Sequence, residues 1–177
     1  MTPPVTVDPA RANERALIEG LFQFYIYDFA EMYGPNDGFE MGSDGRYEPY
    51  PYLDSYWTEA DRWPFIIRYG DKPAGFILLN TFSHRDAAVD RAVAEFFVMR
   101  TYRRLGVGAV AARTVFTRFP GRWELAIAAP NAGARRFWPK VVAGTPGVRD
   151  LQTFDLDGTQ KSRRILAFKI DTRSVAS

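Results

Sequence analysis

The most informative part of the chain is Glu95-Phe96-Phe97-Val98-Met99-Arg100-Thr101-Tyr102-Arg103-Arg104-Leu105-Gly106-Val107-Gly108. From Ala92 to Met99 the residues are almost all apolar, with one acid, which is typical of a central strand buried on both faces. A basic loop with two glycines follows, and apolar residues recur at helical spacing from Val107 to Arg118. The sequence therefore predicts a strand, a short loop and a helix in immediate succession.

This loop has the features of a site for a diphosphate. The first N–H groups of a helix have no partner within the helix, and the helix dipole favours an anion there. Gly106 and Gly108 have no Cβ, so a phosphate can approach the backbone closely, and Arg103 and Arg104 add positive charge. A tight turn before a helix is the alternative, because the spacing matches neither the dinucleotide-binding glycine motif nor the P-loop.

The remaining elements are predicted from periodicity and turn residues. A short strand at 5–7 precedes a helix that Asp8 caps with Pro9 at its first position and that extends to Phe29. A long connection from Tyr33 to Arg62 follows. We expect strands at 65–69, 74–81, 123–128, 151–156 and 164–170, the last two joined across Asp157-Gly158, and a helix at 131–142.

Two motifs resemble those of the GNAT superfamily of acyl-CoA-dependent N-acetyltransferases. Arg103-x-x-Gly106-x-Gly108, after a strand that ends at Val98, is similar to the Arg/Gln-x-x-Gly-x-Gly/Ala signature of that family. The strand at 123–128 and the following Asn131-Ala132-Gly133-Ala134-Arg135-Arg136-Phe137-Trp138 resemble its next strand and helix. The resemblance is strong from Phe65 to Val142 and rests on element order elsewhere.

The resemblance implies a fold, a reaction and a set of binding residues. The fold would be α/β (α+β), one GNAT-like domain over 1–177, with a mixed central sheet of about six or seven strands, a V-shaped splay between its two central parallel strands, and about four flanking helices. Acetyl-CoA would donate an acetyl group to a primary amine of a small molecule or a protein. Acetyl-CoA would be held by Phe96, Phe97, Val98, Arg103, Arg104, Leu105, Gly106, Val107, Gly108, Ala109 and Asn131.

The catalytic groups are less clearly marked. Glu95 is our candidate base, because an acid in an apolar strand has a raised pKa, although it could instead face away and pair with an arginine. Trp138 stands where many family members have a tyrosine that protonates the thiolate. It could be a wall of the pocket that donates a hydrogen bond, another residue could supply the proton, or the thiolate could leave unassisted. His84, Asp54 and Glu40 are weaker candidates, since polar residues in loops are usually solvated.

Composition excludes several other classes of protein. The chain has 177 residues, no Cys, one His and a formal net charge of +2. These values exclude disulfides and thiolate or multi-histidine metal sites, and they give no reason to expect nucleic acid or a membrane as partner. We expect no metal and no signal peptide, and a cytoplasmic location, and we leave a homodimer open as the assembly.

Aromatic residues are concentrated in one part of the sequence. Of the 27 aromatic residues, 14 lie between Phe22 and Phe65. They either pack an irregular region or line a pocket for the acceptor. A non-catalytic module that binds acyl-CoA on the same fold is the alternative function, because Trp138 replaces the tyrosine.

Overall fold

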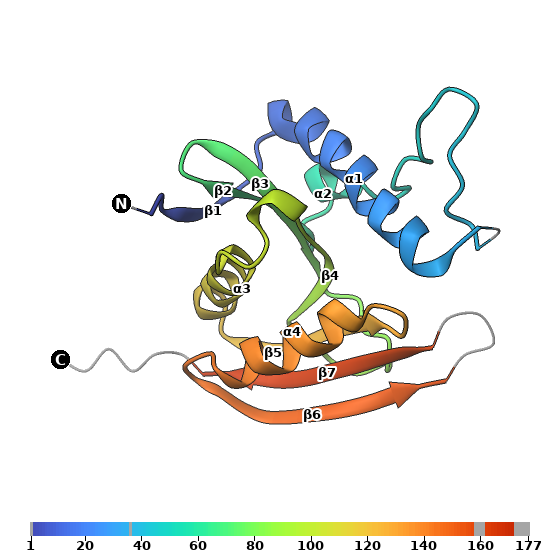
Figure 1. The fold of residues 1–177 in the computed structure, drawn as a ribbon. Coiled ribbons are helices and arrows are strands. Elements are labelled where there is room, and N and C mark those ends of the chain that lie inside the picture. The colour runs from blue at the N-terminus through green and yellow to red at the C-terminus, as the bar shows by residue number, and fades with distance from the viewer. Residues whose placement is uncertain (1, 36, 158–161, 172–177) are drawn as a thin grey trace. The chain divides into compact units, whose positions relative to one another are not determined.

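The predicted strand–loop–helix stretch is present in the computed structural model, which describes residues 2–35, 37–157 and 162–171. The strand is β4, the helix is α3, and a short 3-10 helix, η2, lies in the loop between them (Figure 1). The elements in chain order are β1 (Val5–Pro9), η1 (Ala12–Glu14), α1 (Arg15–Tyr33), α2 (Ser55–Thr58), β2 (Trp63–Tyr69), β3 (Lys72–Asn80), β4 (Arg91–Val98), η2 (Arg100–Tyr102), α3 (Val107–Arg118), β5 (Gly121–Ala128), α4 (Ala132–Ala143), β6 (Val148–Leu156) and β7 (Arg163–Ile170).

The strands form one mixed sheet, as predicted. In the described residues, seven strands are hydrogen-bonded in the order β1-β2-β3-β4-β5-β7-β6. Pairing is parallel between β4 and β5 and antiparallel between β1 and β2, β5 and β7, and β6 and β7. The parallel ladder joins only Arg91–Val93 of β4 to Trp123–Leu125 of β5. A short ladder of this kind is what the predicted splay requires.

By their contacts the residues group into two compact units. The first contains the residues up to Leu78 together with Glu95–Val107, and the second contains Leu79–Ala94 and the residues from Gly108 onward. In the first unit, β1 pairs with β2 and the apolar face of α1 is buried through Ile18, Leu21 and Phe22. The rings of Phe22 and Phe76 stack with centroids 4.5 Å apart, which joins α1 to β3.

The first helix starts later than the sequence predicts. Asp8 and Pro9 do not begin it, because both are paired in β1 with Ile66 and Phe65 of β2. The chain then passes through η1, and α1 begins at Arg15. The side-chain cap in this region is at the start of η1, where a Glu14 carboxylate oxygen accepts the Arg11 N–H at 2.9 Å.

The long connection after α1 is fixed at several points. Gln23 exchanges two hydrogen bonds with the backbone of Tyr47, at 2.8 Å and 3.2 Å. Tyr47, Leu53 and Tyr56 are buried, and Tyr56 belongs to α2. Some of the aromatic residues between Phe22 and Phe65 therefore pack the core of the first unit.

The second unit is built on β5, which pairs with all of β7. Helix α4 packs on the strands of this unit (Figure 1), and its buried residues are Trp138, Val141 and Val142. The Phe116 ring of α3 contacts Trp123 edge-on at 4.9 Å. The predicted helix at 131–142 and the last two strands are confirmed, whereas the turn predicted at Asp157-Gly158 includes residue 158, which lies outside the described residues.

Candidate functional site

Glu95 of β4 lies in the first unit among tyrosines that come from other elements. The Tyr25 hydroxyl of α1 donates a hydrogen bond of 2.5 Å to its carboxylate. The Tyr50 hydroxyl, in the long connection, lies close enough to this carboxylate to affect its pKa. The alternative that Glu95 pairs with an arginine is not observed, since no ion pair to it is present in residues 2–35, 37–157 and 162–171. We refer to Glu95, Tyr25, Tyr50 and Tyr56 as the tyrosine–glutamate cluster.

The surroundings of Glu95 bring its pKa close to neutrality. Burial raises the pKa of Glu95 from 4.5 to about 7, although the hydrogen bond from Tyr25 and the nearby Tyr50 hydroxyl oppose the rise. The side chain is nevertheless only partly buried, so a ligand can reach it. A carboxylate that is reachable and titrates near pH 7 can accept a proton at physiological pH.

Aromatic rings hold the cluster in place. The Tyr25 ring packs edge-on against Phe22, Phe76 and Phe97, with centroids 5.4–5.8 Å apart. Burial, followed by the charge of Glu95, raises the pKa of Tyr25 well above its ordinary value. Tyr25 therefore stays protonated and remains a hydrogen-bond donor to Glu95.

Tyr56 is the buried member of the cluster. Only 3% of its surface is exposed, and its hydroxyl has no hydrogen-bond partner within the described part of the chain. Burial, and then the nearby charge of Glu95, raises the pKa of Tyr56 to about 12. Beyond it, the Arg62 guanidinium lies 5.4 Å from the centre of its ring.

The loop after β4 has the backbone geometry expected of a cradle. The Met99 N–H donates to the Ala74 carbonyl at 2.8 Å, which ends the strand. Arg104 and Gly106 both have left-handed backbone angles, with φ of 64° and 81°. A Cβ added at Gly106 would meet no atom within 4 Å, so the space beside this backbone is open. Leu105 is exposed, and α3 begins at Val107, with Gly108 and Ala109 in its first turn.

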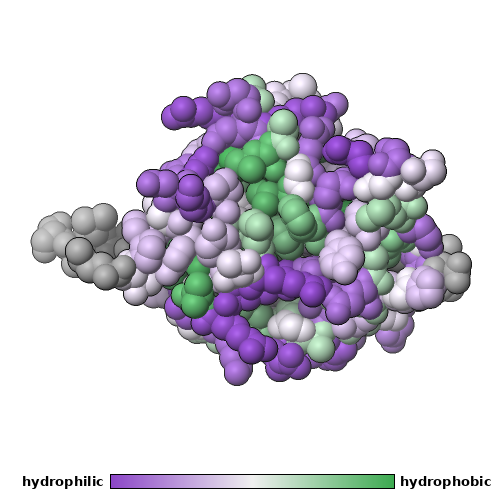
Figure 2. All heavy atoms as spheres, turned by 45° about the horizontal axis from the view of Figure 1, so that its top comes forward, coloured by the Kyte–Doolittle hydropathy of each residue, from purple (hydrophilic) through white to green (hydrophobic). Residues whose placement is uncertain are grey.

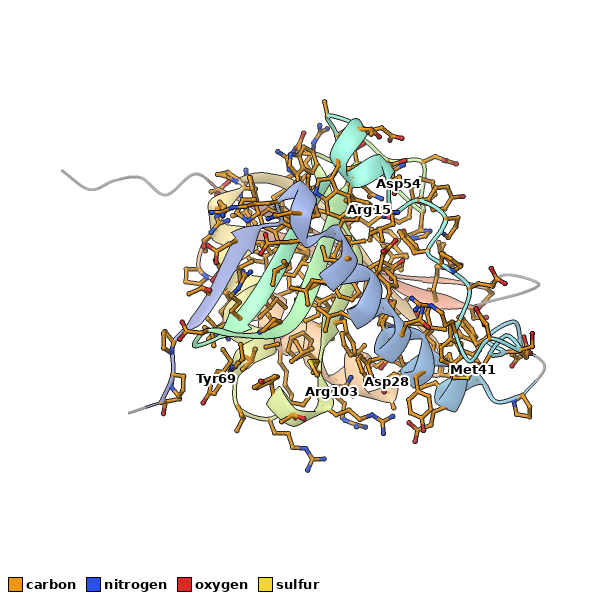
Figure 3. The ribbon with its side chains drawn as sticks, turned by 90° about the horizontal axis from the view of Figure 1, so that it is seen from above. Arg15, Asp28, Met41, Asp54, Tyr69 and Arg103 are labelled. Atoms are coloured by element: carbon orange, nitrogen blue, oxygen red, sulfur yellow. The ribbon has the colours of Figure 1, made fainter. Side chains whose placement is uncertain are left out.

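Arg103 makes contacts that the sequence did not reveal. Its Nε donates to the Val98 carbonyl at 2.8 Å, and its guanidinium forms an ion pair with Asp28 of α1 (Figure 3). Asp28 also forms an ion pair with Arg100 at 2.8 Å, and Arg100 forms a second ion pair with Glu31. The two arginines therefore attach the loop to the end of α1.

Asn131 and Trp138 lie in the second unit. The Asn131 side chain caps α4, because its Oδ1 accepts the Ala134 N–H at 2.9 Å. Trp138 is 6% exposed, with its ring 4.9 Å from that of Phe137 and 6.2 Å from that of Phe116. Both residues therefore stabilise α4 and the packing around it.

The weaker sequence candidates have structural partners. His84 is not simply solvated: it is partly buried, and its Nδ1 lies 2.9 Å from Arg163 Nη1. Burial, and then the charge of Arg163, lowers the pKa of His84. Asp54 forms an ion pair with Arg15 at 2.6 Å (Figure 3), and Glu40 accepts a backbone N–H.

Glu124 of β5 is a buried acid that sequence reasoning missed. It is 1% exposed, and its carboxylate accepts hydrogen bonds from Ser83 Oγ, the His84 N–H and Arg85 Nε at 2.7–3.1 Å. With this number of partners it serves to hold the segment after β3. Its position in an apolar strand was the only available signal, the same one that singled out Glu95.

Two hollows, each of about 410 Å³, are lined by other residues. The hollow in the second unit is lined by charged groups that already have partners, including Arg85 and Lys169. The hollow in the first unit lies beside the exposed side chains of Phe24, Tyr27 and Met41. Figure 2 shows that hydrophobic side chains reach the molecular surface among hydrophilic ones. Neither hollow brings together groups suited to catalysis.

The described residues contain neither a metal-ion site nor a helix that could cross a membrane. Among the described residues, no group of three His, Cys, Asp or Glu side chains is arranged to hold a metal ion. In the same residues, no helix combines the length and the apolar character that a membrane crossing needs.

Comparison with known proteins identifies the family. The model of the acetyltransferase (GNAT) family matches residues 26–142. No curated protein matches the sequence. Among solved structures, an acetyltransferase from Thermus thermophilus is 12% identical with a TM-score of 0.60, covering 94% of this chain and 98% of its own. The ribosomal-protein-S18-alanine N-acetyltransferase from Escherichia coli is 11% identical with a TM-score of 0.57, covering 98% and 99%.

A third structure is the spermidine N-acetyltransferase from Vibrio cholerae in complex with CoA and spermine, which is 12% identical with a TM-score of 0.57 and covers 92% of this chain and 94% of its own. At these identities the structures establish the fold, which confirms the GNAT-like architecture predicted from the two motifs. The family model extends over both motifs and more than half of the sequence. This chain belongs to the GNAT family of acetyltransferases.

Proposed function

We propose that the protein is an N-acetyltransferase that transfers an acetyl group from acetyl-CoA to a primary amine. The observation that carries this proposal is Glu95, a reachable carboxylate with a pKa of about 7, three residues before the end of β4. The loop that follows it offers the N–H groups of a helix start and a glycine with open space beside it. A base and an anion site on one short segment suit acyl transfer from a diphosphate-containing donor.

The chemistry requires one proton acceptor and a place for the donor. Glu95 accepts a proton from the amine, whose nitrogen forms a bond to the thioester carbonyl carbon. The carbon–sulfur bond breaks, and the thiolate leaves with the electron pair. Residues 103–109 bind the diphosphate, and the backbone of Phe96, Phe97 and Val98 binds the pantetheine arm.

The non-catalytic alternative rests on Trp138. An indole N–H has no accessible acid chemistry, so Trp138 cannot protonate the thiolate. In the structure its ring packs beside Phe116, which suits a structural role. A thiolate is a good enough leaving group to depart unassisted, and we therefore favour the enzyme.

The test is to incubate the protein with acetyl-CoA and a panel of primary amines and to measure the free thiol released. An enzyme releases thiol only when an accepted amine is present, and kcat/KM should fall as the pH drops below about 7, because protonated Glu95 cannot act as a base. The control is a thermal shift with CoA alone. At a hundredfold excess over Kd, binding contributes roughly 2.7 kcal/mol to stability. A thermal shift without thiol release would support the binding module, and no binding at millimolar CoA would refute both functions.

A further inference from the structure

Helix α1 has an apolar stripe on the side that faces away from the core of the first unit. Its inner side is buried through Ile18, Leu21 and Phe22. On the opposite side four residues recur at spacings of three, four and three, and they are Leu17, Gly20, Phe24 and Tyr27. Phe24 and Tyr27 are 56% and 55% exposed. The outward side of a surface helix is normally polar, so two exposed rings on this stripe indicate a contact that the single chain does not make.

Gly20 forms a gap in this stripe. A glycine inside a helix is destabilising relative to alanine, because it loses more conformational freedom on folding. No close contact within the chain requires it here, since a Cβ added at Gly20 would meet no atom of the described residues within 4 Å. A position that is unfavourable for the single chain and open on its outer side suits the close approach of a bulky side chain from another molecule. The Phe24 ring, one turn along the same stripe, is a side chain of this kind.

We propose that α1 is the interface of a homodimer, in which α1 of a second copy packs antiparallel on this stripe and Phe24 of each copy fills the gap over Gly20 of the other. The same arrangement places Tyr27 of each copy against Leu17 of the other. Both pairs have their midpoint at position 22, so a single two-fold axis satisfies them together. The stripe is therefore complementary to itself, as the interface of a two-fold dimer must be. This inference does not depend on the proposed function.

The charges at the two ends of α1 favour the antiparallel direction. The first turn of α1 contains Arg15 and no acid, and the last turn contains Glu31 and no base. Both arrangements oppose the helix dipole, which favours acids at the start of a helix and bases at its end. In the proposed register Glu31 of one copy lies beside position 13 of the other, between Arg11 and Arg15. The acidic end of each helix then faces the basic end of its partner, in addition to the ion pairs that Arg15 and Glu31 make within the chain.

The hollow in the first unit extends the surface beside the stripe. Phe24 and Tyr27 line it together with Met41 of the long connection, which lies next to the end of α1 (Figure 3). These three side chains are each a little over half exposed, and since a large apolar side chain has roughly 200 Å² of surface, they expose about 300 Å² in each copy. Two copies would thus cover about 600 Å² from these side chains alone, half of the ~1,200 Å² that the smaller specific interfaces bury. Leu17 and Arg46 add to this area, and we expect a reversible dimer that dissociates on dilution.

Sedimentation equilibrium over a series of protein concentrations tests the dimer. The wild-type mass should rise with concentration from 20.1 kDa toward twice that value. Gly20→Leu makes the surface more apolar and should still weaken association at least about tenfold, because the added side chain occupies the space that Phe24 needs. The matched control is Gly133→Leu, which adds the same side chain to an exposed glycine of α4 and should leave association unchanged. At a concentration where both proteins are monomeric, Gly20→Leu should unfold at a higher urea concentration than the wild type, since leucine favours a helix and its Cβ meets nothing in the described residues.

Disulfide formation tests the register of the two helices. The chain has no Cys, so each substitution introduces a unique thiol. A mixture of Leu17→Cys and Tyr27→Cys should form a mixed disulfide dimer on oxidation, because the two positions face each other in the proposed pair. Either variant alone should cross-link at least about tenfold more slowly. Its two thiols would lie ten residues apart along the helices, which is about 15 Å and beyond the reach of a disulfide.

Each result either supports or overturns the proposal. A mass of 20.1 kDa at every concentration up to the submillimolar range would refute the dimer. A dimer that Gly20→Leu leaves intact, that Gly133→Leu weakens equally, or whose cysteine variants cross-link no faster in the mixture than alone would show that another surface forms it, which would overturn the assignment of α1. Release of thiol from acetyl-CoA by a protein that stays monomeric would overturn the dimer and leave the proposed function intact.

Discussion

Replacing Glu95 by Gln should raise the free energy of unfolding, and only at pH values at which Glu95 is ionised. The folded protein holds the pKa of Glu95 at about 7, against an ordinary value of 4.5, chiefly because of burial. A raised carboxyl pKa means that the folded state binds this proton more tightly than the unfolded state does. Stability from this group is therefore fully present below pH 4.5 and is lost as the pH rises to about 7.

The magnitude follows from the size of the shift. Each pKa unit corresponds to about 1.4 kcal/mol, so ionised Glu95 would lower the free energy of unfolding by about 3 kcal/mol. This value is an upper limit, because the side chain is partly exposed and solvent screens its charge. Gln has nearly the same shape, still accepts the Tyr25 hydrogen bond and does not ionise, so it avoids this loss.

The assay is urea unfolding of both proteins at a series of pH values between about 4 and 8. The difference in free energy of unfolding should grow in favour of Glu95→Gln across this range and then level off. Asp90, whose pKa Arg122 lowers to about 2, titrates below the range and is present in both proteins, so it does not affect the difference. A difference that does not change with pH would refute the assigned environment of Glu95.

Three other substitutions test the loop, the sheet and the second unit. Gly106→Val should lower stability and weaken CoA binding in calorimetry, because a β-branched side chain is strained at a φ of 81° and would occupy the open space beside the loop. The control is Gly45→Val, at a φ of 76° in similarly open surroundings, which should lower stability to the same extent without weakening CoA binding. Gly75→Ala should destabilise the fold by about 3 kcal/mol or more in urea unfolding, since its Cβ would lie 2.0 Å from the Phe97 carbonyl oxygen. Trp138→Phe should keep most of kcat if the indole ring only packs, and Trp138→Tyr could exceed the wild-type rate. A loss of kcat of about tenfold to a hundredfold in a folded Trp138→Phe protein, with KM for acetyl-CoA unchanged, would assign the indole N–H a catalytic role.

Local patterns in the sequence predicted the elements around the loop because their causes are local. The change from a continuous apolar run to helical spacing marks β4 and α3, and the asparagine at the start of α4 is a frequent cap. The start of α1 was wrong for the same reason. Asp8 and Pro9 are a good local start signal for a helix, but pairing with β2, far away in the sequence, keeps both in a strand.

The candidate site depends on contacts over long sequence separations, so the sequence could supply only one of its members. Glu95 was predicted from its apolar neighbours, yet the same signal applies to Glu124, which has a structural role. What distinguishes them is their partners: Glu124 pairs with Arg85, whereas Glu95 accepts a hydrogen bond from the hydroxyl of Tyr25, which is 70 positions away in the sequence. No periodicity indicates which of the clustered tyrosines reach Glu95.

Arg103 shows how a residue can match a motif and still act through other atoms. The sequence suggested that its charge attracts the diphosphate, but Asp28, of which only 12% of the side chain is exposed, neutralises much of that charge. Its Nε bonds the Val98 carbonyl, so the side chain fixes the end of β4 relative to the loop. The attraction for an anion then falls on Arg104, which is exposed, and on the N–H groups at the start of α3. If the loop holds the diphosphate as we propose, its conformation contributes more to that binding than the number of its arginines does.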